Sequence, residues 1–404
     1  MRTNFLYLFT IFLCFQFHSC HSQTSSEKNK EKDLSEVKNN IVGGPFENGE
    51  FMYHGIPETL KAVDTSPGWK QEGQKLLITG KILKSDGKTP AANVILYYYH
   101  TNTEGYYAPN DAMDKRASRH GYIRGWVQSD SLGNYSIYTV RPGAYPNRND
   151  PAHIHPSIKE PTLDKEYYID AFVFDDDPLL TSKKRLEMEN RGGSGILRLL
   201  KKGDLHIAEH NIILGLNIPN YPSKNNEKVS SGSAIGEDVI SFTPFHAWGP
   251  DKGSKTCPVC KYGRYHGILY FVGNDPNWDE IKQWLSYLEN ESAERSSYLK
   301  TYFVYGNEGN YDKDKITKQL AEIGKSLQLE HTALTFVPSF NDTSSAIRHN
   351  KINPNVENTF LIYKHSTIID KYVNLKPTTS NYNKIKASLD RTTNNFQLLP
   401  TIHQ

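Results

Sequence analysis

Two histidines in the middle of the chain have the spacing of a metal-binding pair. His153 and His155 flank the β-branched residue Ile154. Successive side chains of a strand point to opposite faces, so an extended segment here projects both imidazoles from the same face. Tyr145 lies shortly before them in a Pro-Gly-Ala-Tyr-Pro turn and brings a phenol towards the same place. This spacing predicts two nitrogen ligands and one oxygen ligand for a metal ion.

A second phenol is available upstream, after an apolar and aromatic run at residues 94–100 that is typical of a strand. The run leads into a loop in which Gly105 is followed by Tyr106 and Tyr107. A phenol has an ordinary pKa of about 10, so two ionised phenols at neutral pH require a strongly Lewis-acidic cation. Hard oxygen donors favour iron over metals that prefer soft ligands. Ferric iron is therefore the ion that these donors predict.

At these positions the chain resembles the intradiol ring-cleavage dioxygenases, the family of the protocatechuate and catechol dioxygenases. The resemblance covers roughly residues 74–215 and is carried by residues 105–107, 124–125, 129–135, 139–146 and 151–155. It implies a β-sandwich that binds Fe(III) through Tyr107, Tyr145, His153 and His155, with Tyr106 as the alternative to its neighbour. It also implies that a catecholic small molecule and dioxygen are the substrates. Substrate binding is expected to displace Tyr145, which then acts as a base.

The chain departs from the family pattern at one position. Three residues before the first histidine the family usually has an arginine, and this chain has Asp150. Arg148, two residues earlier, is the expected electrostatic helper of catalysis. The alternative is a non-catalytic β-sandwich that binds a surface carbohydrate or a partner protein.

Length and composition indicate the number of domains, the class of partner and the location of the protein. A chain of 404 residues predicts two or three domains, and 47 basic against 45 acidic residues give no reason to expect a nucleic-acid partner. Residues 1–20 are predicted to be a secretory signal with a loose bacterial lipobox. Lipidation of Cys20 would then anchor an exported protein in a bacterial cell envelope; an ordinary signal cleaved slightly later is the alternative. Residues 21–40 are expected to form a disordered tether.

The remaining chain predicts two folded units. Residues 41–218 are expected to form the β-sandwich, with residues 41–73 as an irregular lead-in and a hairpin turn at Asp86-Gly87. Residues 219–240 are rich in Pro, Ser, Gly and Asn and predict a linker. Residues 241–395 then show a βαβαββα pattern, which predicts an α/β domain with a mixed sheet and resembles the thioredoxin-like fold.

The second unit contains a Cys-x-x-Cys motif, Cys257 and Cys260. In thioredoxins this motif follows the first long strand, whereas here it precedes the strand. An exported chain favours a disulfide or a redox-active pair. A zinc site completed by His246 and His266 is the alternative. If the pair is redox-active, the second unit could be the active part of the protein and the sandwich its support.

Overall fold

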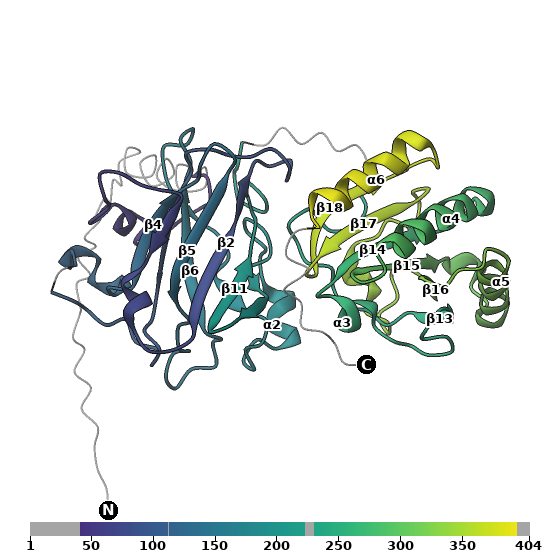
Figure 1. The fold of residues 1–404 in the computed structure, drawn as a ribbon, viewed down its shortest axis with the longest axis horizontal. Coiled ribbons are helices and arrows are strands. Elements are labelled where there is room, and N and C mark those ends of the chain that lie inside the picture. Colours follow the sequence, from purple (N-terminus) through teal and green to yellow (C-terminus); the bar gives the residue numbers. More distant parts are fainter. Residues whose placement is uncertain (1–40, 112, 223–229, 394–404) are drawn as a thin grey trace, which may run out of the picture.

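The computed structural model describes residues 41–111, 113–222 and 230–393, which form two folded units side by side (Figure 1). The predicted signal, the lipidation site Cys20 and the tether lie outside the described residues, as does part of the predicted linker. None of the described helices is long and apolar enough to cross a membrane.

The first unit is built from two mixed β-sheets. The first sheet has the strand order β1-β5-β2-β11-β10, with β12 beside β2, and the second has the order β4-β3-β6-β8-β9, with β7 beside β6. The strands of the first sheet are β1 (Val63–Thr65), β2 (Lys75–Leu83), β5 (Asn134–Val140), β10 (Leu199–Lys202), β11 (Leu205–Glu209) and β12 (Ile212–Ile213). Those of the second are β3 (Ile95–His100), β4 (Arg124–Gln128), β6 (His153–Lys159), β7 (Tyr167–Tyr168), β8 (Phe172–Phe174) and β9 (Ile196–Leu197).

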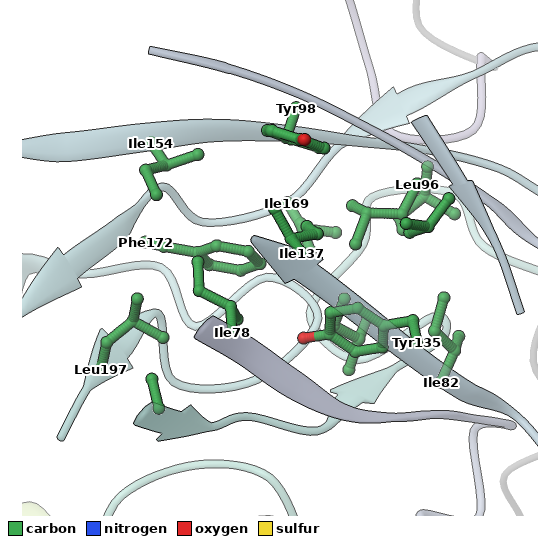
Figure 2. Packing of buried hydrophobic residues seen from close by; sticks show 14 of the residues in the cluster. Ile78, Ile82, Leu96, Tyr98, Tyr135, Ile137, Ile154, Ile169, Phe172 and Leu197 are labelled. Carbon is green, nitrogen blue, oxygen red and sulfur yellow. The ribbon is translucent and has the colours of Figure 1, made fainter. Parts of the chain in front are cut away.

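One hydrophobic core lies between these two sheets (Figure 2). Ile78 and Ile137 enter it from the first sheet, and Leu96, Ile154 and Phe172 enter it from the second. Each large side chain buried in this way contributes roughly 1.5–3 kcal/mol of transfer free energy. The predicted β-sandwich is thus confirmed. Because Ile154 points into the core, the residues on either side of it in β6 point out of the core.

The predicted hairpin at Asp86-Gly87 is confirmed only beside the turn, and the prediction that the two flanking strands pair with each other is wrong. The turn itself forms, since the Gly87 N–H donates to the carbonyl of Lys84 at 2.8 Å and Leu83 makes an antiparallel bridge with Pro90. The chain then crosses to the other sheet, so β2 pairs with β5, and β3 pairs with β4 and β6. Both strands carry apolar faces, and placing them in opposite sheets buries both faces against each other.

The described helices of the first unit are all short. They are the α-helix α2 (Ser182–Glu187) and the 3-10 helices η1 (Gly49–Tyr53), η2 (Pro67–Lys70) and η3 (Lys115–His120).

The second unit has one mixed sheet with the strand order β13-β16-β15-β14-β17-β18. Its strands are β13 (Phe245–Trp248), β14 (His266–Val272), β15 (Leu299–Gly306), β16 (Thr332–Val337), β17 (Thr359–Lys364) and β18 (Thr367–Val373). Its helices are α3 (Pro258–Tyr262), α4 (Trp278–Glu294), α5 (Lys313–Ser326), α6 (Thr379–Arg391), and the 3-10 helices η4 (Glu308–Asn310) and η5 (Ile347–Asn350). Apolar residues of α4, α5 and α6 share one core with the sheet. From β14 onwards the order is βαβαβββα, with one strand more after α5 than the predicted pattern. Likeness to thioredoxin stays a prediction.

The described end of the predicted linker packs against both units. Ser231, Ser233 and Val239 are buried. The N–H of Ser194 in the first unit donates to the carbonyl of Gly236 at 2.7 Å, and the Gly236 N–H donates to Ile368 of β18 at 2.8 Å. Residues 230–240 therefore join the units rather than separate them.

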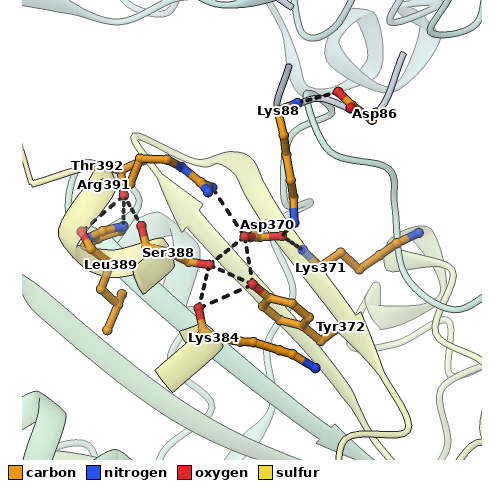
Figure 3. Close-up of polar contacts among 11 residues, drawn as sticks. Asp86, Lys88, Asp370, Lys371, Tyr372, Lys384, Ser388, Leu389, Arg391 and Thr392 are labelled. Atoms are coloured by element: carbon orange, nitrogen blue, oxygen red, sulfur yellow. Dashed lines mark hydrogen bonds and ion pairs between the residues drawn. The ribbon is translucent and has the colours of Figure 1, made fainter. Parts of the chain in front are cut away.

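A buried carboxylate forms a second joint between the units (Figure 3). Asp370 of β18 has no exposed side-chain surface and pairs with Lys88 of the first unit at 2.7 Å and with Arg391 of α6 at 3.3 Å. The hydroxyls of Ser388 and Tyr372 donate to the same carboxylate at 2.5 and 2.9 Å. Burial raises the pKa of Asp370, but these donors outweigh it and leave the pKa below its ordinary value.

Candidate functional site

Strand β6 holds both predicted histidines on its outer face. His153 and His155 alternate with Ile154, whose side chain is fully buried in the sandwich core. The strand is held on both edges, because His155 pairs with Tyr99 of β3 and His153 pairs with Val173 of β8. If the register of β6 shifted by one residue, Ile154 would point outwards and the two histidines would point into the core. Packing of Ile154 in the core therefore fixes the direction of both histidines.

The two tyrosines come from loops that lie against each other. Tyr107 follows β3, and Tyr145 lies between β5 and β6. Gly105 has a φ of +85°, and a Cβ there would lie 2.0 Å from the carbonyl oxygen of Ala144. A Cβ at Gly143 would lie 2.4 Å from the carbonyl oxygen of Thr103. These two glycines let the loops approach closely enough for their tyrosines to meet.

The four side chains converge on one point. The Tyr145 Oη lies 2.5 Å from the Tyr107 Oη, 3.1 Å from the His153 Nε2 and 3.2 Å from the His155 Nε2. The two Nε2 atoms are 3.0 Å apart. Residues from three separate segments thus place two oxygens and two nitrogens together.

Electrostatics inside this cluster favour neutral side chains when no cation is present. Loss of hydration raises the pKa of Tyr107, and the hydrogen bond with Tyr145 raises it further. The pKa of Tyr145 is also raised, mainly by desolvation. The pKa of His155 falls to about 3, chiefly by desolvation and then by the neighbouring charge of His153. The imidazole of His155 is therefore neutral at pH 7 and can offer a lone pair.

This donor set fits a bound cation. The Nδ1–H of His153 donates to the carbonyl of Pro151 at 2.7 Å, so its Nε2 carries the lone pair when the ring is neutral. Metal-binding histidines usually have such a partner on the other ring nitrogen. Ligands bonded to one ion at about 2.0–2.1 Å lie about 3 Å apart, which matches the spacing of these four atoms. A bound cation would also offset the free-energy cost of ionising two phenols that are shielded from water.

The neighbouring residues differ in their access to this cluster. The side chain of Tyr106 is 56% exposed, and the hydroxyl of Tyr107 is the one that meets Tyr145. Arg148 is exposed, and its guanidinium lies 5.7 Å from the centre of the Tyr145 ring. Asp150 is exposed on the same loop. The charge of Arg148 lowers the pKa of Tyr145, and that of Asp150 raises it, but both effects are smaller than desolvation.

A column of stacked rings supports His155, and the sequence reasoning did not single it out. The ring of Tyr99 stacks on His155 at 4.8 Å and on His120 at 3.7 Å between ring centres. The His120 Nδ1 also lies 2.8 Å from the Tyr97 Oη. The alternation of Tyr97 and Tyr99 along β3 is visible in the sequence. The position of His120, which comes from η3, depends on the tertiary fold.

Asp177 is a second supporting residue that the sequence did not reveal. Its carboxylate accepts the Ala152 N–H at 2.8 Å, directly before His153. Asp177 also accepts the Leu179 N–H at 2.8 Å. This buried acid therefore ties the start of β6 to the turn after β8.

The cysteine pair forms a separate feature in the second unit. Cys257 and Cys260 are joined by a disulfide at the start of α3, before β14. His246 Nε2 bonds to the carbonyl of Thr256, and His266 Nε2 bonds to Thr392, so these rings face other partners. No group of three or more His, Cys, Asp or Glu side chains in the described part of the chain is arranged to hold a metal ion. The geometry therefore favours the disulfide over the zinc alternative.

Comparison with known proteins finds proteins that are similar to the first unit. Residues 50–187 match the family model described as Dioxygenase. The protocatechuate 3,4-dioxygenase beta chain of Burkholderia cepacia is 29% identical over 113 residues, which cover 27% of this chain and 48% of that protein. Catechol 1,2-dioxygenase of Acinetobacter baylyi is 28% identical over 123 residues, covering 26% and 39%. This chain thus spans less than half the length of both curated relatives.

A solved dioxygenase domain, from a dioxygenase and carbohydrate-binding protein fusion of Streptomyces sp. SirexAA-E, aligns with 42% of this chain and 95% of its own, at 18% identity and a TM-score of 0.30.

The segment that carries the tyrosine–histidine cluster therefore matches the dioxygenase family model and is similar in sequence to two dioxygenases. The names of these two relatives are protocatechuate 3,4-dioxygenase beta chain and catechol 1,2-dioxygenase.

Proposed function

We propose that this protein cleaves a catecholic ring between its two hydroxyl-bearing carbons and inserts both atoms of dioxygen, using Fe(III) held by Tyr107, Tyr145, His153 and His155. The convergence of these four donors, with each neighbouring pair 2.5–3.2 Å apart, is the observation that carries the proposal. The relationship to catechol and protocatechuate dioxygenases supports the reaction class.

Bound ferric iron would supply a Lewis acid that holds an ionised catechol and brings it together with dioxygen. The protein would hold the ligands in place. The Pro151 carbonyl fixes the ring of His153, and stacking on Tyr99 fixes that of His155. Ligands held in this way need little reorganisation during the reaction.

Tyr145 is the residue we assign as base. Its Oη contacts the other three donors, and it lies on the loop between β5 and β6 rather than within a strand. Its phenolate would take the proton from one catechol hydroxyl and become a neutral phenol. The exposed cation of Arg148, beside the ring of Tyr145, would attract the anionic substrate. Arg148 thereby takes the place that the family gives to an arginine at the position of Asp150.

A visible absorption spectrum of the protein without residues 1–20, recorded with iron quantified, tests this proposal. Phenolate bound to ferric iron is coloured, and the band should shift when catechol is added. Tyr107→Phe should remove much of the band. Tyr106→Phe is the matched control, because its side chain is 56% exposed and its hydroxyl is not one of the four converging donors, and it should leave the band unchanged. A protein that stays colourless and iron-free after ferric reconstitution would contradict the proposal.

The sequence of residues 1–20 also supports a proposal about location. We infer that the protein is exported and anchored to a bacterial envelope by a lipid on Cys20. Mass spectrometry of the membrane fraction should find the lipid on the N-terminal peptide. Cys20→Ala should abolish that modification; a signal cleaved beyond residue 20 without lipid would overturn this proposal.

A further inference from the structure

A cavity of about 570 Å³ lies between the two units. Helix α2 of the first unit contributes Arg185 to its wall, and helix α3 of the second unit contributes Cys260 and Lys261. Figure 1 shows these two helices on the facing sides of the two units. The cavity is large enough for a small organic molecule. It is also separate from the tyrosine–histidine cluster, because none of those four residues lines it.

The charged side chains in the wall favour an anion. Four cationic residues line the cavity, Arg185, Arg198, Lys261 and Arg264, against two acidic ones, Asp175 and Asp238. Arg185 pairs with Asp175 at 2.6 Å, and Arg198 pairs with Asp238 at 2.5 Å, which accounts for both acids.

Two cations remain in the wall after these pairings. Lys261 pairs with Asp251 at 2.8 Å, and this acid does not line the cavity. Arg264 is exposed and makes no ion pair with another described residue. Its guanidinium is therefore available to a ligand, and the cavity keeps a positive excess.

The disulfide forms part of the same wall, and its two sulfurs differ. Cys260 is exposed and lines the cavity, whereas Cys257 is partly buried and does not. The Cys257 Sγ accepts the backbone N–H of Cys260 at 3.0 Å. A thiolate formed at Cys257 would keep this donor, which makes Cys257 the better leaving group of the two.

We propose that this cavity is a thiol–disulfide exchange site for small thiols that carry an anionic group. The incoming thiolate attacks the Sγ of Cys260, a new S–S bond forms there, and the Cys257–Cys260 bond breaks to release Cys257 as a thiolate. A second thiolate then attacks the mixed disulfide and releases Cys260. Two thiols are oxidised to one disulfide, and the protein disulfide is reduced by the same two electrons. The anionic group of the thiol contacts Arg264.

Reduction kinetics with three small thiols test the charge preference. The probes are 2-mercaptoethanesulfonate, 2-mercaptoethanol and cysteamine, which carry a negative charge, no charge and a positive charge. Rates are measured at low salt by alkylation of the freed cysteines and expressed per thiolate. We expect the sulfonate to react on the order of 10-fold faster than cysteamine, with the difference shrinking as salt is added. Equal rates, or a faster reaction of cysteamine, would overturn the proposal.

Two further measurements locate the reaction. Arg264→Gln should reduce the advantage of the sulfonate several-fold, whereas Lys318→Gln, which removes an exposed charge from α5 outside the cavity, should not. After an acid quench and alkylation, peptide mass mapping should find the probe on Cys260 and the alkyl label on Cys257. The reverse labelling, or equal effects of the two substitutions, would refute the assignment. None of these readouts needs iron, so they do not depend on the proposed dioxygenase reaction.

Discussion

The tyrosine–histidine cluster and the disulfide both arise from short motifs, but the protein builds them in different ways. The cluster joins residues from three segments, the loops around Tyr107 and Tyr145 and strand β6. The disulfide closes within four residues, at the start of one short helix. The cluster is packed against stacked rings, whereas Cys260 faces a cavity between the units.

A different physical property therefore governs each site. The geometry of the ligands in the cluster depends on close packing. Metal binding by the cluster should therefore fail when a substitution moves the neighbouring strands or loops. The reactivity of the disulfide depends on access and on nearby charge, so it should respond to surface substitutions instead. Substitutions that affect one site and spare the other test this distinction.

The largest effect is expected at a predicted ligand. His155→Ala removes one nitrogen donor and the ring that stacks on Tyr99, so ferric affinity should fall roughly 100-fold or more. Titration of iron against a competing chelator measures this. His331→Ala, at an exposed histidine of the second unit, is the control and should keep wild-type affinity. The rate of disulfide reduction should be the same in both variants; an iron affinity unchanged by His155→Ala would remove this residue from the site.

The next largest effect is expected where the two tyrosine loops touch. Gly105→Ala places a Cβ at a φ of +85° and 2.0 Å from the Ala144 carbonyl oxygen, and should lower the free energy of unfolding by about 2–4 kcal/mol. Gly203→Ala has a similar φ of +61° but open space around the Cβ, and should cost only about 1 kcal/mol. Urea unfolding measures both. Equal losses would show that the loop contact is not tight.

Acid should destabilise both units through buried histidines. Burial lowers the pKa of His210 to about 4 and that of His266 to about 3, below the unfolded value of about 6.5. The unfolded chain therefore binds protons first, and stability present above pH 6.5 is lost as the pH falls towards 4. Each histidine should contribute about 2 kcal/mol of loss between pH 7.5 and pH 5. Urea unfolding across this range measures it, and His210→Gln should flatten the dependence; an unchanged slope would exclude that histidine as a cause.

The smallest effect is expected at the joint between the units. Lys88→Ala leaves the buried Asp370 without one of its cations and should lower stability by about 1–2 kcal/mol, because Lys88 is itself 41% exposed. Lys376→Ala removes pairs with Glu280 and Glu357 that are more exposed, and should cost less than about 1 kcal/mol. Thermal unfolding compares the two. A larger loss for Lys376→Ala would show that the Asp370 network does not hold the units together.

The local part of both sites can be predicted from residue types and their spacing. Alternation along an extended strand put His153 and His155 on one face, and a separation of three residues brought Cys257 and Cys260 within bonding reach. The sandwich class also followed from the sequence, because short strands with regular turns indicate it. These features depend on backbone geometry over a few residues, which residue types and spacing express directly.

The remaining features of both sites depend on the packing of distant segments. The turn at Asp86-Gly87 was readable, yet its strands separate into two sheets because a shared core buries more apolar surface than a hairpin would. The orientation of Tyr107 rather than Tyr106, the stacking of His120 on Tyr99 and the cavity beside Cys260 all arise from contacts between distant segments. Such contacts depend on how whole elements pack, and no local spacing in the chain specifies them.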